Sequence, residues 1–185
     1  GARNVIMDFH PGEFLRLVEQ ERATILNLVA TMAAMALAEP SLPQRDLSSL
    51  RGLVFAGSML PASLREKTQA RLCPNIYEYY GMQETGALTV STPDDRKFRP
   101  KSIGAPMAFA DVRIERPDGS LCAPGELGEI VGRSPATVTR YFENPEKSAE
   151  TFRGGYVHTG DLGLMDEEGF VFIKGRLKDM IITGG

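Results

Sequence analysis

Short apolar runs alternate with helical patterns along the first 98 residues, and this alternation constrains the fold more than any other feature. Apolar positions three and four residues apart indicate helices, whereas short apolar runs bounded by glycine or proline indicate buried strands. The helical patterns cover residues 11–22, 30–38 and 61–72, and the strand-like runs cover residues 24–28, 53–56 and 75–80. Such alternation predicts an α/β fold with a mostly parallel sheet flanked by helices.

The character of the sequence changes after a charged, proline-containing connector at residues 96–100. Beyond it the patterns are those of short strands and turns, with one short helix that follows a capping Asn144. We therefore expect a small β-barrel-like subdomain. The predicted organisation is an α/β subdomain at 1–98 and a small β subdomain at 99–174.

Composition excludes several classes of protein. The 185 residues carry a net charge of −3, and the 21 basic residues are scattered, so nothing indicates a nucleic-acid-binding surface. Cys73 and Cys122 are too few for a disulfide framework, which predicts free thiols and a cytoplasmic protein. His10 and His158 cannot form a multi-histidine metal site. The longest apolar stretch, 23–38, is shorter than the roughly 20 residues of a membrane helix.

Two segments that follow predicted strands carry residues suited to binding a flat ligand. The segment 56–60 begins with the small residues Ala-Gly-Ser, and ligands of open α/β sheets collect at this edge. An ordinary strand-to-helix turn is the alternative. Residues 79–86 combine Tyr80, on which an adenine could stack, with Glu84, a carboxylate that could hold Mg²⁺. The alternative is a tyrosine-rich strand followed by a glycine turn and a solvated glutamate.

A third segment, residues 154–161, ends in Thr-Gly-Asp. An aspartate fixed at a glycine turn can accept hydrogen bonds from both hydroxyls of a ribose, although a plain turn with a capping aspartate would look the same. The charged cluster at 175–179 follows, and alone it reads as a solvated connector.

Taken in order, these motifs resemble the adenylate-forming superfamily, in particular its acyl- and aryl-CoA synthetase branch. The resemblance rests on five segments and covers nearly the whole chain. They are Gly57-Ser58-Met59, Tyr80-Gly81-Met82-Gln83-Glu84, the Gly-Glu-Leu-Gly-Glu-Ile run at 125–130, residues 156–161 and residues 175–185.

The resemblance implies a role for each matching residue. Gly57, Ser58 and Met59 would border the adenine and the acyl pocket. Tyr80 would stack on adenine, and Gly81 would provide backbone beside the AMP moiety.

The remaining matches complete the implied site. Met82 would continue the backbone beside AMP, and Glu84 would bind Mg²⁺. Asp161 and Arg176 would hold the ribose hydroxyls. Residues 175–185 would form a hinge segment, with Lys178 at the point about which a C-terminal domain rotates.

One residue departs from the family pattern. Gln83 stands where the family usually has a threonine whose hydroxyl reaches a phosphate oxygen. Its amide can also donate a hydrogen bond, from a longer side chain. Gln83 is therefore the least typical of the candidate catalytic residues, Glu84 and Gln83.

The family's phosphate-binding loop and catalytic lysine have no counterpart in these 185 residues. We therefore expect a piece of a larger enzyme that is inactive alone, with the missing parts of the same polypeptide as its partners. The expected complete enzyme uses ATP, Mg²⁺ and CoA to activate a small carboxylic acid, most simply a fatty acid whose tail lies along residues 24–38. Core packing explains 24–38 equally well. The alternatives are an adenylation domain that loads a carrier protein and a non-catalytic relic that binds a nucleotide or a partner.

Overall fold

The computed structural model describes residues 1–57 and 60–179, and the chain divides into two compact units, Gly1–Tyr77 and Glu78–Gly185. The division lies before residue 98, where the sequence changes character, because the hairpin that follows Tyr77 packs with the later residues. The functional boundaries at 98 and 174 stay a prediction.

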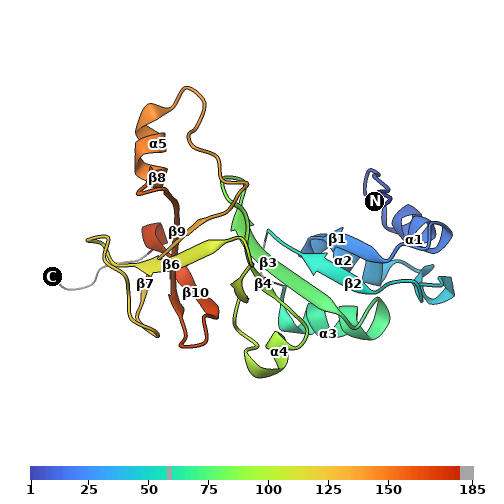
Figure 1. The fold of residues 1–185 in the computed structure, drawn as a ribbon. Coiled ribbons are helices and arrows are strands. Elements are labelled where there is room, and N and C mark those ends of the chain that lie inside the picture. Colours follow the sequence, from blue (N-terminus) through green and yellow to red (C-terminus); the bar gives the residue numbers. More distant parts are fainter. Residues whose placement is uncertain (58–59, 180–185) are drawn as a thin grey trace. The chain divides into compact units, whose positions relative to one another are not determined.

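The first unit is an α/β structure whose elements follow the predicted order (Figure 1). Strands β1 and β2 pair in parallel, from Ile25 opposite Gly52 to Leu28 opposite Phe55. The elements are α1 (Pro11–Gln20), β1 (Ile25–Leu28), α2 (Ala30–Ala38), the 3₁₀ helix η1 (Leu42–Gln44), β2 (Gly52–Phe55) and α3 (Ala62–Arg71). The parallel pair and its crossover helix confirm the predicted α/β layer.

The core of this unit lies between the helices and the strands. Helix α1 buries Phe14, Leu15 and Val18, which the helical period places on one face. Phe55 of β2 is 1% exposed, and truncating a side chain buried in this way costs about 3–5 kcal/mol. Helix α2 contacts both α1 and α3.

The second unit begins with antiparallel strands. Strand β3 (Ile76–Met82) crosses the division between the units and pairs with β4 (Gly86–Ser91), which pairs in turn with β5 (Ala105–Pro106). Strand β3 was predicted from the sequence, whereas β4 was not. Helix α4 (Asp95–Phe98) forms one turn within the charged connector.

A second sheet follows, with strands in the order β10-β9-β7-β6 and antiparallel pairing throughout that order. Its long central strand β9 also pairs with the two-residue β8, which α5 precedes (Figure 1). The elements are β6 (Asp111–Glu115), β7 (Gly128–Arg133), α5 (Pro145–Thr151), β8 (Phe152–Arg153), β9 (Tyr156–Met165), β10 (Val171–Arg176) and the 3₁₀ helix η2 (Leu177–Asp179). The predicted small β subdomain is thus present.

Several local predictions hold and one needs correction. Asn144 caps α5, since its Oδ1 accepts a hydrogen bond from the backbone N–H of Lys147 at 3.1 Å. Both cysteines are free thiols, Cys73 buried and Cys122 half-buried. However, the Thr-Gly-Asp segment does not form a turn between elements. It lies inside β9, because a bulge accommodates it within one continuous strand.

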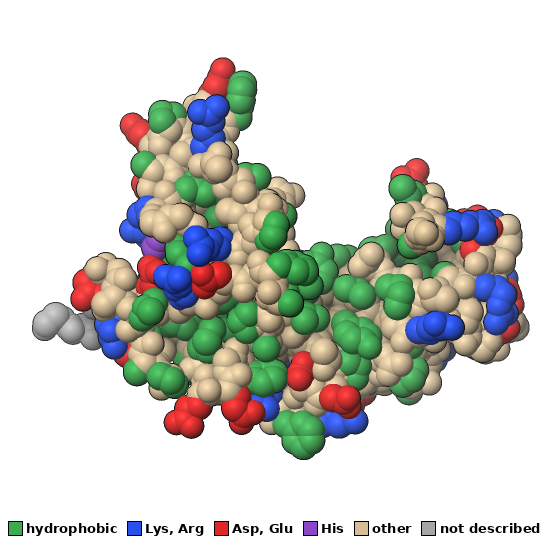
Figure 2. Space-filling model, in the orientation of Figure 1, with side chains coloured by type: hydrophobic (Ala, Val, Ile, Leu, Met, Phe, Trp, Pro, Cys, Tyr) green, Lys and Arg blue, Asp and Glu red, His purple; other side chains and the backbone are tan. Residues whose placement is uncertain are grey.

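Acidic and basic side chains are interspersed on the face of the molecule seen in Figure 2, in agreement with the scattered charges of the sequence. Across residues 1–57 and 60–179, every helix is too short or too polar to span a bilayer. The apolar stretch at 23–38 forms β1 and the nine-residue helix α2.

Candidate functional site

The tip of the β3–β4 hairpin carries two of the predicted site residues, Gln83 and Glu84. Met82 pairs with Gly86 across the hairpin, and Gly86 adopts a positive φ of 65°, as a short hairpin loop requires. Thr85 is fully buried, and its hydroxyl donates to the carbonyl of Gly86 at 2.8 Å and accepts from the N–H of Met82 at 3.1 Å. The hairpin thus holds the tip in one conformation.

Gly81 is required by the close approach of the two hairpin strands. A Cβ atom at this position would lie 2.0 Å from the carbonyl oxygen of Gly86. A bulge between Tyr80 and Gly81 accompanies this contact. The structure thus gives Gly81 a packing role within the hairpin, and its predicted role beside a nucleotide stays a prediction.

Glu84 is held by a neighbour that the sequence did not reveal. The hydroxyl of Tyr141 donates to Oε1 of Glu84 at 2.6 Å, and the N–H of Val138 donates to the Glu84 carbonyl at 2.9 Å. The hydroxyl of Ser134 donates to the carbonyl of Thr85 at 2.5 Å. Burial, followed by the hydrogen bond to Glu84, raises the pKa of Tyr141, so this hydroxyl remains a donor at neutral pH. The loop after β7 therefore fixes the carboxylate at the hairpin tip.

Three predicted residues, Tyr80, Asp161 and Arg176, form one polar cluster. The Tyr80 hydroxyl donates to Oδ2 of Asp161 at 2.7 Å, and Nε of Arg176 lies 2.7 Å from Oδ1. The Asp161 side chain is 9% exposed, whereas that of Arg176 is 62% exposed. The cluster thus presents a nearly buried carboxylate beside a solvent-facing guanidinium.

Strand irregularities bring this cluster together. Asp161 pairs directly with Arg176 across β9 and β10, and a register shift between Ile173 and Gly175 lies just before this pair. On the other side of β9, the residues around Gly160 bulge away from β7. Bulges of this kind re-aim side chains within a sheet.

Burial raises the pKa of Tyr80 far above its ordinary value, and the Asp161 carboxylate adds to this effect. A hydrogen bond with Thr159 and the charge of Arg176 lower this pKa, but burial is the largest effect. The phenol therefore stays protonated and donates to Asp161 throughout the physiological range.

The remaining predicted residues are less closely connected. Gly57 lies in the first unit with a φ of +81°, and a Cβ there would meet nothing within 4 Å. Ser58 and Met59 lie outside the described residues. The backbone N–H of Met82 donates to Thr85 within the hairpin. Gln83 is exposed at the hairpin tip, and Lys178 is exposed in η2.

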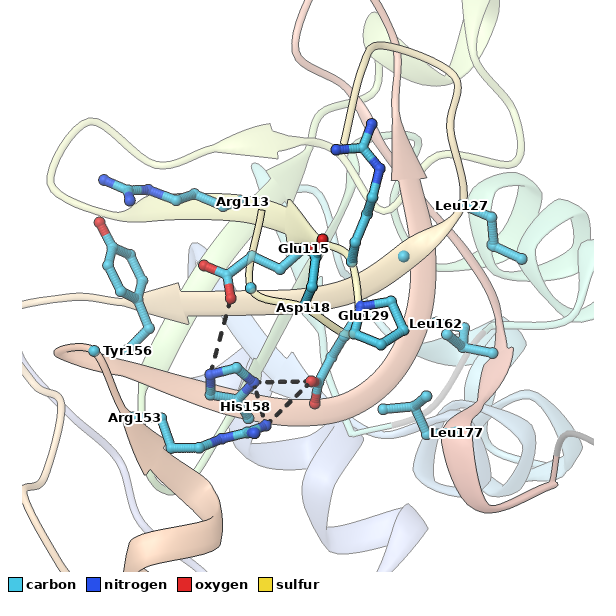
Figure 3. A pocket seen from close by; sticks show the side chains of 15 residues that line it. Arg113, Glu115, Asp118, Leu127, Glu129, Arg153, Tyr156, His158, Leu162 and Leu177 are labelled. Carbon is cyan, nitrogen blue, oxygen red and sulfur yellow. Dashed lines mark hydrogen bonds and ion pairs between the residues drawn. The ribbon is translucent and has the colours of Figure 1, made fainter. Parts of the chain in front are cut away.

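A second cluster lines an open pocket of about 660 Å³ in the second unit (Figure 3). His158 lies between two carboxylates: its Nδ1 is 2.8 Å from Oε2 of Glu129, and its Nε2 is 4.0 Å from Oε2 of Glu115. Arg153 lies alongside, with Nη2 3.6 Å from the same Glu129 oxygen. Within the described part of the chain, no three histidine, cysteine or acidic residues are arranged to hold a metal ion.

The chain is similar in sequence to known acyl- and aryl-CoA ligases. It is 40% identical over 182 residues to feruloyl-CoA synthase from Amycolatopsis sp, covering 96% of this chain and 36% of that protein. It is 35% identical over 178 residues to a long-chain-fatty-acid–CoA ligase from Bacillus subtilis (strain 168), covering 96% and 32%. The chain therefore spans about a third of the length of these relatives.

A solved structure gives the same result. O-succinylbenzoate coenzyme A synthetase from Bacillus subtilis, in complex with ATP and magnesium ion, superposes with a TM-score of 0.83 at 31% identity. The match covers 96% of this chain and 36% of that one. These likenesses confirm the predicted resemblance to acyl- and aryl-CoA ligases. Because the family model described as AMP-binding enzyme matches residues 1–142, the chain belongs to the AMP-binding enzyme family.

Proposed function

We propose that the complete protein to which this chain belongs activates a carboxylic acid with ATP and transfers the acyl group to coenzyme A. In the first step a carboxylate oxygen attacks the α-phosphorus, and the bond to pyrophosphate breaks to give an acyl-adenylate. In the second step the CoA sulfur attacks the acyl carbon, AMP leaves, and the thiol proton passes to solvent. The observation that carries this proposal is the cluster of Tyr80, Asp161 and Arg176.

The cluster suits the nucleoside part of ATP. Each carboxylate oxygen has two acceptor positions, so the bonds from Tyr80 and Arg176 leave Asp161 able to accept from ribose hydroxyls. The Tyr80 ring offers a face for adenine. Arg176, mostly exposed, can turn one of its other N–H groups toward the ribose.

Glu84 fits the requirements of Mg²⁺. This ion is usually held by one or two carboxylates together with water and substrate phosphates, rather than by a complete protein cage. Tyr141 fixes the orientation of the Glu84 carboxylate through Oε1. When bound, the ion would neutralise charge that develops on the phosphates.

A fatty acid is the proposed substrate class, and an aromatic acid is the alternative. Within 24–38, Ala33, Ala36 and Leu37 are buried in the core, which agrees with the packing interpretation of this segment. Ile25, Val29 and Met35 are 53%, 41% and 48% exposed, so these large apolar side chains are available to an acyl tail. The relatives named above include enzymes of both substrate classes by name.

Two other functions are open to the same chain. A carrier protein could accept the acyl group in place of CoA. A non-catalytic relic is favoured by one feature alone, Gln83 at the hairpin tip. The cytoplasmic location stays a prediction.

The test is pyrophosphate exchange and thioester formation by the complete protein. Fatty acids of increasing length and aryl acids are supplied in turn with ATP and Mg²⁺, then with CoA or with a phosphopantetheinylated carrier protein. Acid-dependent exchange followed by acyl-CoA release is the expected result. Exchange with transfer to the carrier alone would identify a loading enzyme, and a folded protein without exchange for any acid would identify a relic.

A further inference from the structure

On the side that faces β7, the backbone just before Asp161 is held by side chains rather than by the regular strand ladder. Four residue steps in β9, from Leu162 back to His158, oppose only two steps in β7. Gly160, within this bulge, has a φ of +72°. The N–H of Gly160 cannot form the regular hydrogen bond between the strands. The position of Asp161 therefore depends on the groups that bind the bulge.

Glu129 of β7 binds the bulge. Its Oε1 accepts a hydrogen bond from the N–H of Gly160 at 3.0 Å. The Thr159 hydroxyl donates to the carbonyl of Ile130 at 2.6 Å and accepts from the N–H of Asp161 at 3.1 Å. The bulge is therefore tied to β7 at Thr159 and Gly160, the two residues that precede Asp161.

Glu129 is itself fixed from the pocket side (Figure 3). Its side chain is 15% exposed, and Oε2 lies 2.8 Å from Nδ1 of His158 and 3.6 Å from Nη2 of Arg153. Nη2 of Arg153 also lies 2.7 Å from Nδ1 of His158. Because arginine only donates, Nδ1 either accepts a hydrogen bond from Arg153 or, in the other tautomer, donates one to Glu129. In both cases a cation or an imidazole N–H faces Oε2, which leaves Oε1 directed at the bulge.

We infer that Glu129 is a positioning residue for Asp161, and that His158 and Arg153 support it in this role. The inference rests on the proposed function, in which Asp161 holds the ribose hydroxyls. Glu129 touches no substrate: it acts through the N–H of Gly160. This positioning requires a side chain long enough to place an oxygen at the N–H of Gly160. A neutral amide oxygen at the same place would accept the same hydrogen bond.

The test separates reach from charge. Glu129→Gln keeps an oxygen that reaches Gly160 and removes the charge, whereas Glu129→Asp keeps the charge and shortens the side chain by one methylene. Glu126→Gln and Glu126→Asp are the matched controls, because Glu126 precedes the same strand and pairs with Arg116, with Nε 2.6 Å from Oε1. All four variants are made in the complete protein and checked by thermal melting.

The readout is selectivity for the ribose hydroxyls, which general loss of stability would not change. It is the ratio of KM for 2′,3′-dideoxy-ATP to KM for ATP in acid-dependent pyrophosphate exchange. We expect the wild type to favour ATP by about tenfold or more, the smallest effect of a hydrogen bond to a charged group. Glu129→Asp should bring the ratio toward one by raising KM for ATP, while Glu129→Gln and both controls keep it.

Other outcomes overturn the inference. One is a KM ratio in Glu129→Asp that equals that of the wild type. The others are a fall of this ratio in Glu129→Gln, or in Glu126→Asp, as large as the fall in Glu129→Asp. If Glu129→Asp does not fold, His158→Gln removes the support of Glu129 and carries the same test, with a lowered ratio supporting the inference and a wild-type ratio overturning it. A folded wild type without acid-dependent exchange would overturn the proposed function itself, and this result is recognised before any variant is measured.

Discussion

Asp161 and Arg176 stand directly opposite each other on β9 and β10, and Nε of Arg176 lies 2.7 Å from Oδ1 of Asp161. The contact joins a nearly buried carboxylate to a mostly exposed guanidinium. An exposed partner of this kind adds little stability because solvent screens it. Its importance is therefore expected in ligand binding, where a nucleotide would cover both groups.

Replacing Asp161 should weaken ATP binding selectively. In the complete protein, Asp161→Ala is expected to raise KM for ATP by about tenfold to a hundredfold, or roughly 1.5–3 kcal/mol for a lost charged acceptor. KM for the acid should change little. Initial-rate kinetics check this, with Asp118→Ala in an exposed turn as the control. An unchanged KM for ATP in a folded variant would remove Asp161 from the site.

Position 81 should tolerate only glycine. In Gly81→Ala the new Cβ would meet the Gly86 carbonyl oxygen at 2.0 Å, a backbone atom that cannot move without opening the hairpin. The free energy of unfolding should fall by at least the upper end of the usual overpacking cost of about 1–3 kcal/mol. Gly175→Ala is the matched control, since its Cβ would meet nothing within 4 Å. Urea unfolding of both variants measures the difference, and equal stabilities would contradict the expected clash.

The raised pKa of Tyr80 predicts a loss of stability at alkaline pH. The folded protein holds the phenolic proton more tightly than the unfolded chain, whose pKa is near 10.0. The contribution of this proton to the free energy of unfolding is therefore fully present below pH 10. It is lost as the pH rises above 10, at up to about 1.4 kcal/mol per pH unit. Urea unfolding at about pH 9 and about pH 11 should show a smaller decline in Tyr80→Phe than in the wild type. A decline of the same size would mean that Tyr80 ionises normally; Tyr79→Phe, with an exposed ring, is the control.

The 185 residues alone should form no acyl-adenylate. They span only 36% and 32% of the two ligases compared above, so most of such an enzyme lies outside them. Pyrophosphate exchange by the purified chain should equal the background measured without protein, with the complete protein as the positive control. Exchange that survives repurification and disappears in Glu84→Ala would show that the piece is sufficient.

Lys178 offers a test of the predicted hinge. It lies in η2 (Leu177–Asp179), and proline there would fix φ near −65° and remove the N–H. If a domain rotates about this residue between the two steps, Lys178→Pro should leave adenylation near normal and slow transfer to CoA steeply. Single-turnover measurements of pyrophosphate and thioester release separate the steps, and Lys178→Ala controls for the side chain. Equal losses in both steps would indicate misfolding, and no loss would place the hinge elsewhere.

Local sequence patterns were sufficient for elements whose signals are continuous. Helix α2 occupies the predicted residues 30–38, and the Asn144 cap is present. Strand β9 was missed because Gly160 resembles a turn residue, while the bulge that accommodates it depends on pairing with β7. Strand β4 was not predicted, because it is defined by pairing with β3 and β5 rather than by a local pattern.

The candidate site was predicted only as far as single motifs extend. Tyr80 and Asp161 were both singled out, but their hydrogen bond joins residues 81 positions apart. The links from Tyr141 to Glu84 and from Gly160 to Glu129 span 57 and 31 positions. No periodicity or spacing records such contacts, since they arise only when the sheet forms. The Glu at position 129 was visible as part of a motif, without any signal for its role.

Strand β9 has two different sides, and this has a consequence for inhibitor design. Tyr156, His158 and Leu162 line the open pocket, whereas Asp161, between them in sequence, contacts Tyr80. A compound that fills the pocket would press on the reverse side of the strand that carries Asp161, the carboxylate that we propose faces the nucleotide. Such a compound need not imitate ATP, and a screening collection without nucleoside-like molecules would be a sensible place to find it.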